Sequence, residues 1–257
     1  MRKVFVFILL LAMSISFATD VPIDISSADI TYKMEGTIFV TIGPASSINI
    51  IEFNGSVVPQ FEGRNDKLYG ATLTYDELGN EILTREYQDV EDNINWDYYT
   101  EFKTKSNFQK LSNLASFPHE VYPANVEKYL EFSKNSNINE DIRETASSIV
   151  QGSETVVEAA LKLSEWVHNN IEYDSEFYGR NYDAETVFEN KKGVCGEFSS
   201  LLVSMLRSVG IPARYVPGYV YSNIPGYDGF GAHAWIEFYD PVNGWIPTDP
   251  TFGEFGF

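Results

Sequence analysis

The stretch Gly193–Val209 constrains this chain most, because it places the only cysteine of 257 residues at the start of a well-defined helix. Apolar residues recur there at the three- and four-residue spacing of a helix with one buried face: Phe198, Leu201, Leu202, Met205, Leu206 and Val209. Gly210 and Pro212 follow, and both are usual signals for a helix end. The pattern predicts a helix with Cys195 in or just before its first turn.

A cysteine at a helix start is suited to nucleophilic catalysis. Unpaired backbone N–H groups and the positive end of the helix dipole favour a thiolate there. The same N–H groups, including that of Gly196, can hold the oxyanion that forms when the thiolate attacks a carbonyl. The alternative is that Cys195 is a small buried hydrophobic residue, as most lone cysteines are.

Two later segments predict a β-hairpin. Residues 231–239 alternate as a strand, with His233 and Trp235 on one face. Turn residues at 240–244 separate this strand from a returning strand over residues 245–251.

The register of this hairpin decides whether its polar side chains meet. If the five-residue connection closes the hairpin, Tyr239 faces Trp245 and His233 faces Thr251. Asp249 is then the diagonal neighbour of His233 on the same face, within reach of its ring. A slip of one residue would place Asp249 on the opposite face. The first register provides a general base and a group that orients it.

Four ordered blocks of sequence resemble the transglutaminase-like superfamily. They are Gly-Val-Cys-Gly-Glu-Phe at 193–198, the segment 206–214, Ala-His-Ala-Trp at 232–235, and Gly-Trp-Ile-Pro-Thr-Asp-Pro-Thr at 244–251. The resemblance is strongest over roughly Ser153 to Phe257. It implies a papain-like fold in which the helix that begins with the nucleophile packs on an antiparallel sheet.

The resemblance also implies roles for individual side chains. In that family a cysteine, a histidine and an aspartate form a catalytic triad, and those roles fall on Cys195, His233 and Asp249. Family members use an upstream aromatic side chain to help hold the oxyanion, for which Tyr173 is a candidate. Trp235 shares a face with His233, so it either walls the substrate cleft or packs in the core.

The predicted fold class is α+β, in two domains. Residues 19–108 contain short strand-like runs separated by turn residues, which predicts an antiparallel β-sandwich-like domain. Within it, Asn54-Gly55 is interpreted as a tight turn rather than a glycosylation site. Residues 109–138 are expected to connect this domain to the catalytic domain, residues 139–257. Asn139, Thr155 and Asp183 are the expected helix caps of the second domain.

The first 18 residues have the features of an export signal. Arg2 and Lys3 precede an apolar run, and Ser16-Phe17-Ala18 fits a cleavage site. The protein is therefore expected to be secreted or extracytoplasmic, and an uncleaved leader would tether it. With one cysteine it has no internal disulfide. The chain ends eight residues after Asp249, where this family usually continues, so either the fold closes early or the C-terminus is truncated.

The net charge of −19 limits the partners, since nucleic acid and anionic membrane surfaces both repel it. The charge is compatible with a cationic amine or a basic polypeptide substrate, although a solvated acidic surface explains it more simply. Neither His119 nor His168 has a partner at metal-ligand spacing, so no metal and no cofactor are expected.

The expected activity is acyl transfer from amide bonds of proteins or peptides through a thioester. Water would resolve the thioester in a peptidase or amidase, and a lysine or other primary amine would resolve it in a cross-linking acyltransferase. The alternative is a non-catalytic protein-interaction module that keeps the fold.

Overall fold

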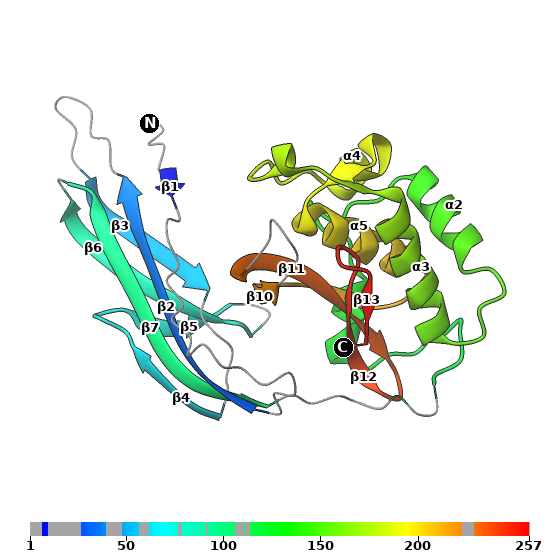
Figure 1. Cartoon of the computed structure of the whole chain (residues 1–257), viewed down its shortest axis with the longest axis horizontal. Coiled ribbons are helices and arrows are strands. Elements are labelled where there is room, and N and C mark those ends of the chain that lie inside the picture. Colours follow the sequence, from blue (N-terminus) through cyan, green and yellow to red (C-terminus); the bar gives the residue numbers. More distant parts are fainter. Residues whose placement is uncertain are drawn as a thin grey trace. The chain divides into compact units, whose positions relative to one another are not determined.

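The computed structural model describes residues 7–9, 27–39, 48–56, 62–76, 79–90, 92–105, 111, 114–222 and 229–256. The chain divides into two compact units, residues 1–107 and 108–257, each of which Figure 1 shows. No helix among these described ranges is both long and apolar enough to cross a bilayer.

Where the structure describes the first unit, its strands form two antiparallel sheets, consistent with the expected sandwich-like arrangement. One sheet has the order β1-β2-β7-β4, formed by Phe7–Leu9, Ser27–Phe39, Ile94–Lys105 and Glu62–Lys67. The other has the order β3-β6-β5, formed by Ile48–Ser56, Glu81–Val90 and Thr72–Tyr75. Strand β1 lies within the stretch expected to be an export leader, and it pairs with β2.

The prediction of a turn at Asn54-Gly55 is wrong. Both residues lie inside β3, where Asn54 pairs with Thr84 and Gly55 pairs with Leu83 of β6. The ladder to β6 continues past this dipeptide, so strand pairing overrides its turn preference. Strands β5 and β6 are antiparallel neighbours and pair up to Tyr75 and Glu81.

The described residues of the second unit form five α-helices. They are α1 (Ala124–Glu127), α2 (Glu140–Ile149), α3 (Val156–Asn170), α4 (Ala184–Asn190) and α5 (Cys195–Ser208), and two 3₁₀ turns lie at Lys128–Leu130 and Ser175–Phe177. The three predicted caps are confirmed: Asn139, Thr155 and Asp183 each accept a backbone N–H of the following first turn, at 2.9 to 3.1 Å. The helix predicted from the Phe198–Val209 pattern is α5. Residues 109–138, expected to connect the two domains, belong to this unit and include helix α1.

An antiparallel sheet in the order β10-β11-β12-β13 completes the second unit. Its strands are Ala213–Ser222, Gly229–Asp240, Gly244–Asp249 and Glu254–Phe255, and a short parallel pair joins β8 (Glu172–Tyr173) to β9 (Lys192–Gly193). The predicted hairpin register is confirmed, because Tyr239 pairs with Trp245. The ladder ends at Ile236 and Thr248, where β12 turns to meet β13.

Helix α5 is the centre of this unit. It contacts α2, α3 and α4 as well as β10 and β11, and Figure 1 shows it between the other helices and the sheet. Its apolar side chains are buried together with those of the facing strands: Phe198, Leu201, Leu202, Met205, Leu206, Ile236, Phe238 and Ile246. The unit is thus an α+β fold whose core fixes the helix that begins with Cys195.

Replacing Leu201 with alanine is expected to lower the free energy of unfolding by about 2 to 5 kcal/mol, since Leu201 is fully buried in this core. Urea unfolding measures the loss. The matched control is Leu161→Ala on α3, where the side chain is 36% exposed and a change of about 0.5 kcal/mol or less is expected. Equal losses in both variants would contradict the central role of α5.

Candidate active site

Cys195 is the first residue of α5 and is partly exposed. The loop before it is anchored by the pairing of β9 with β8, and the N–H of Asp174 donates to the carbonyl of Gly193 at 2.9 Å. A Cβ on Gly193 would lie 2.5 Å from Cβ of Glu197, so only glycine lets the first turn of α5 fold this close to the loop. The local sequence therefore fixes the position of the sulfur.

Glu197 matters for the charge of Cys195, because a free carboxylate next to the sulfur would destabilise a thiolate by repulsion. Its oxygens instead accept two backbone N–H groups, that of Val194 at 3.1 Å and that of Tyr182 at 3.2 Å. The residue is 4% exposed. Glu197 thus caps the start of α5 and joins it to the preceding loop, and these donors partly offset its charge.

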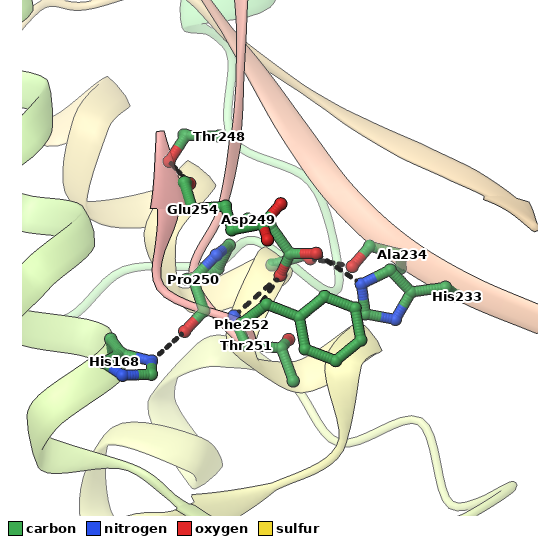
Figure 2. Close-up of polar contacts among 10 residues, drawn as sticks. His168, His233, Ala234, Thr248, Asp249, Pro250, Thr251, Phe252 and Glu254 are labelled. Atoms are coloured by element: carbon green, nitrogen blue, oxygen red, sulfur yellow. Dashed lines mark hydrogen bonds and ion pairs between the residues drawn. The ribbon is translucent and has the colours of Figure 1, made fainter. Parts of the chain in front are cut away.

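His233 and Asp249 meet as the hairpin register predicts. Nε2 of His233 and Oδ2 of Asp249 are 2.5 Å apart, and both side chains are buried (Figure 2). The pairing of β11 and β12 stops at Ile236 and Thr248, before His233 and Thr251 would come opposite one another. The turn that begins after Asp249 bends the chain at this point, and the carboxylate lies against the imidazole.

A tight turn holds the carboxylate of Asp249. Its Oδ1 accepts the N–H groups of Thr251 at 2.8 Å and Phe252 at 3.1 Å, as Figure 2 shows. The ring of His168 on α3 makes a hydrogen bond to the carbonyl of Pro250 at 3.1 Å. Each carboxylate oxygen therefore has a defined partner, which fixes the direction in which Asp249 faces His233.

His233 also interacts with Cys195. Burial acts to lower the pKa of His233, but hydrogen bonds to Asp249 and Cys195, with the charges of both groups, raise it to about 9. Because Nε2 binds Asp249, Nδ1 is the nitrogen left for the sulfur. At neutral pH the ring is therefore an imidazolium beside the thiol, an arrangement suited to a thiolate–imidazolium pair.

Two aromatic rings lie near the imidazole. The ring of Phe252 stacks on His233 with centroids 4.6 Å apart and planes 16° apart, and the ring of Trp235, two residues along β11, has its centroid 6.4 Å from that of His233. Trp235 crosses Gly218 of β10 so closely that a Cβ there would lie 2.5 Å from the indole. Trp235 thus lies beside His233, as its strand position predicts.

The aromatic candidates for the oxyanion are placed differently from each other. Tyr173 pairs with Gly193 in the short parallel ladder, packs on Phe198, and its hydroxyl lies 2.6 Å from that of Tyr178. The hydroxyl of Tyr215, on β10, lies 3.4 Å from where a Cβ on Gly196 would be.

The sequence pattern does not indicate Phe252, Gly218 or Tyr215. Phe252 follows Asp249 by three residues, so a tight turn after the aspartate is the one local signal that could have indicated it. Gly218 and Tyr215 lie on β10. Their sequence pattern predicts a strand but not its neighbours, because their proximity to the site arises from tertiary packing.

Replacing Phe252 with alanine is expected to lower the alkylation rate of Cys195 by iodoacetamide at pH 7 about tenfold, because the imidazole loses the ring that fixes its plane. Mass spectrometry of the modified protein over time measures the rate. Phe132→Ala, which removes a ring that is 40% exposed, is the control and is expected to react like the wild type. Equal rates in all three proteins would show that Phe252 does not position the base.

The remaining histidines form no metal site. His119 makes a hydrogen bond to the carbonyl of Val121 at 2.9 Å, and His168 binds Pro250. Across the described part of the chain, no group of three or more His, Cys, Asp or Glu side chains is placed to hold a metal ion.

The fold and the Cys-His-Asp arrangement define a known class. The family model of the transglutaminase-like superfamily matches residues 143–250, a range that includes Cys195, His233 and Asp249. Residues 143–250 are therefore similar to the transglutaminase-like domain of that superfamily.

Relatives with known sequence or structure agree with this assignment. YebA of Bacillus subtilis, an uncharacterized protein, is 31% identical over 133 residues, which are 46% of this chain and 18% of YebA. A protein-glutamine gamma-glutamyltransferase of Pseudomonas aeruginosa is 35% identical over 72 residues, 26% of this chain and 11% of the enzyme. The chain thus spans less than a fifth of either relative. The crystal structure of a proposed cysteine protease from Cytophaga hutchinsonii has the same fold, with a TM-score of 0.56 and 22% identity over 88% of this chain and 75% of that one.

Proposed function

We propose that the second unit is a cysteine enzyme that transfers acyl groups from amide bonds of proteins or peptides. Cys195 is the nucleophile, His233 the general base and acid, and Asp249 the group that orients the imidazole. One observation carries this proposal: the imidazole of His233 is hydrogen-bonded to the carboxylate of Asp249 and also interacts with Cys195.

The first half-reaction follows from this arrangement. The thiolate of Cys195 attacks the amide carbon, and a tetrahedral intermediate with a negatively charged oxygen forms at the start of α5. The intermediate collapses as the C–N bond breaks, and the imidazolium of His233 gives its proton to the leaving amine. A thioester on Cys195 remains, with neutral His233 ready to take a proton from the next nucleophile.

The second half-reaction depends on the acceptor. Attack by water makes the protein a peptidase or amidase, and attack by a lysine or other primary amine makes it a cross-linking acyltransferase. The Pseudomonas relative's name supports a glutamine side chain as donor and an amine as acceptor. The net charge of −19 also suits a cationic amine, which it attracts.

The test incubates purified full-length protein with casein and a fluorescent primary amine, and mass spectrometry follows the products. Amine incorporation supports transamidation, and cleavage or deamidation supports hydrolysis. The matched control is Cys195→Ser, which keeps the size of the side chain but removes the thiolate, and it is expected to give neither product. If wild type and control are equally inert, and Cys195 reacts with iodoacetamide no faster than a free thiol, a non-catalytic interaction module is the better account.

We also propose that the enzyme acts outside the cytoplasm, either secreted or tethered by an uncleaved leader. The support is the basic and apolar sequence of residues 1–18 with its small-residue cleavage pattern. Expression of the full chain in a bacterial host, followed by fractionation and mass analysis of the N-terminus, tests this. Cytoplasmic protein that still begins at Met1 would contradict it.

A further inference from the structure

Tyr215 touches the candidate site from the sheet side. It lies on β10 opposite Ile236, so its side chain is on the same face of the sheet as the residues that pack under α5. Its hydroxyl lies 3.4 Å from where a Cβ on Gly196 would be, beside the residue that follows the nucleophile. The side chain remains 44% exposed. Tyr215 therefore lies at the start of α5 and also reaches the surface.

The raised pKa of Tyr215 suits its hydroxyl to act as a hydrogen-bond donor. Burial, together with the negative charges of Cys195 and Glu197, raises the pKa of Tyr215 to about 12. The phenol thus keeps its proton throughout the range in which a cysteine enzyme works. A neutral hydroxyl beside a site of developing negative charge stabilises that charge without transferring a proton.

We propose that the hydroxyl of Tyr215 is a catalytic hydrogen-bond donor to the oxyanion of the tetrahedral intermediate, together with the backbone N–H groups at the start of α5. This inference rests on the proposed function. The sulfur of Cys195 forms a bond to the carbonyl carbon, and the π electrons of the carbonyl move to its oxygen. Tyr215 donates a hydrogen bond to that oxygen while it is charged. The carbonyl then reforms, and the leaving group departs with the bonding pair.

Tyr173 is the competing donor, and the structure separates the two. The hydroxyl of Tyr173 lies 2.6 Å from that of Tyr178, and its ring packs on Phe198. The hydroxyl of Tyr215 is the one beside Gly196, and it is close enough to Cys195 and Glu197 for their charges to raise its pKa. The proposal therefore places the side-chain donor downstream of the nucleophile in sequence.

Two reagents that attack the same sulfur isolate this role. Acylation of Cys195 by p-nitrophenyl acetate passes through an oxyanion, and its phenolate leaves without a proton from His233. Alkylation by iodoacetamide displaces iodide at a saturated carbon and forms no oxyanion. Removing an oxyanion donor should therefore slow the first reaction and leave the second unchanged.

The experiment compares full-length wild type with Tyr215→Phe, Tyr173→Phe and Tyr219→Phe, and Cys195→Ser gives the background. In Tyr215→Phe the acylation rate is expected to fall on the order of 10²-fold, with the alkylation rate unchanged. Tyr219 lies four residues further along the same face of β10, so Tyr219→Phe is the matched control and should retain both rates. Tyr215→Leu repeats the measurement without the ring, and circular dichroism checks the fold of each variant.

Three results would overturn the inference while leaving the proposed function intact. They are unchanged acylation in Tyr215→Phe, an equal fall of acylation and alkylation in that variant, and loss of acylation in Tyr173→Phe alone. A different result would contradict the proposed function itself. In that case wild-type Cys195 would react with both reagents no faster than a free thiol.

Discussion

Replacing His233 with glutamine is expected to lower turnover on the order of 10⁶-fold, the scale on which removal of a triad base acts in other acyl-transfer enzymes. The same variant should lose about 10²-fold in the rate of alkylation by iodoacetamide at pH 6.5. At that pH an ordinary thiol is only about 1% ionised, whereas a thiol paired with an imidazolium retains its thiolate. Glutamine keeps a donor that can reach Asp249 but carries no positive charge. Alkylation reactions quenched at successive times and analysed by mass spectrometry, from pH 5 to 9, measure the alkylation rate.

The control for this variant is His119→Gln. His119 has a backbone partner, Val121, and no role in the proposed mechanism, so its replacement is expected to leave both rates unchanged. If His233→Gln reacts with iodoacetamide as fast as the wild type at pH 6.5, the imidazole does not activate the sulfur. The mechanism would then have no general base.

The parts of the fold that the sequence predicts are those with local causes. Asn139, Thr155 and Asp183 cap their helices because a short polar side chain accepts the N–H three residues later, which depends on nothing distant. The hairpin of β11 and β12 is similar, since the length of its connection fixes the register. That register brings His233 to Asp249 across 16 residues of sequence.

The parts that the sequence does not predict depend on packing between distant elements. Asn54-Gly55 favours a turn in isolation, yet it lies in β3 because β6 pairs along its full length. Tyr215 reaches Gly196 only because β10 packs against α5. The direction of Glu197 depends on the backbone of Tyr182, 15 residues earlier, which no periodicity indicates.

These contacts also explain how an acidic protein could hold the anionic nucleophile that the proposed mechanism requires. Near Cys195, the carboxylate of Glu197 is taken up by two backbone N–H groups, and that of Asp249 by the turn and the imidazole. The imidazolium of His233, whose pKa of about 9 keeps it protonated at neutral pH, interacts with the sulfur of Cys195. The raised pKa of His233 depends in turn on its hydrogen bond to Asp249 and on the charge of that carboxylate.

Replacing Asp249 with asparagine is accordingly expected to lower turnover on the order of 10⁴-fold and to move the alkaline limit of activity to lower pH. The amide oxygen can still accept the N–H groups of Thr251 and Phe252, so the turn is kept, but the negative charge is lost. The pKa of His233 should then fall from about 9 towards the usual 6.5, so the imidazolium is lost near neutral pH. Kinetics of p-nitrophenyl acetate hydrolysis from pH 5 to 10 measure the shift.

The same substitution should change how stability depends on pH. Because the pKa of His233 is raised in the folded protein, its stabilising contribution is complete below pH 6.5 and is lost as pH rises through about 9. The free energy of unfolding in urea should therefore fall across this window in the wild type, and fall less in Asp249→Asn. Cys195→Ser is the control, since it keeps Asp249 and should retain most of the dependence. If Asp249→Asn keeps both the alkaline limit and the pH-dependent stability of the wild type, Asp249 does not hold the charge of the base, and the triad is only a geometric coincidence.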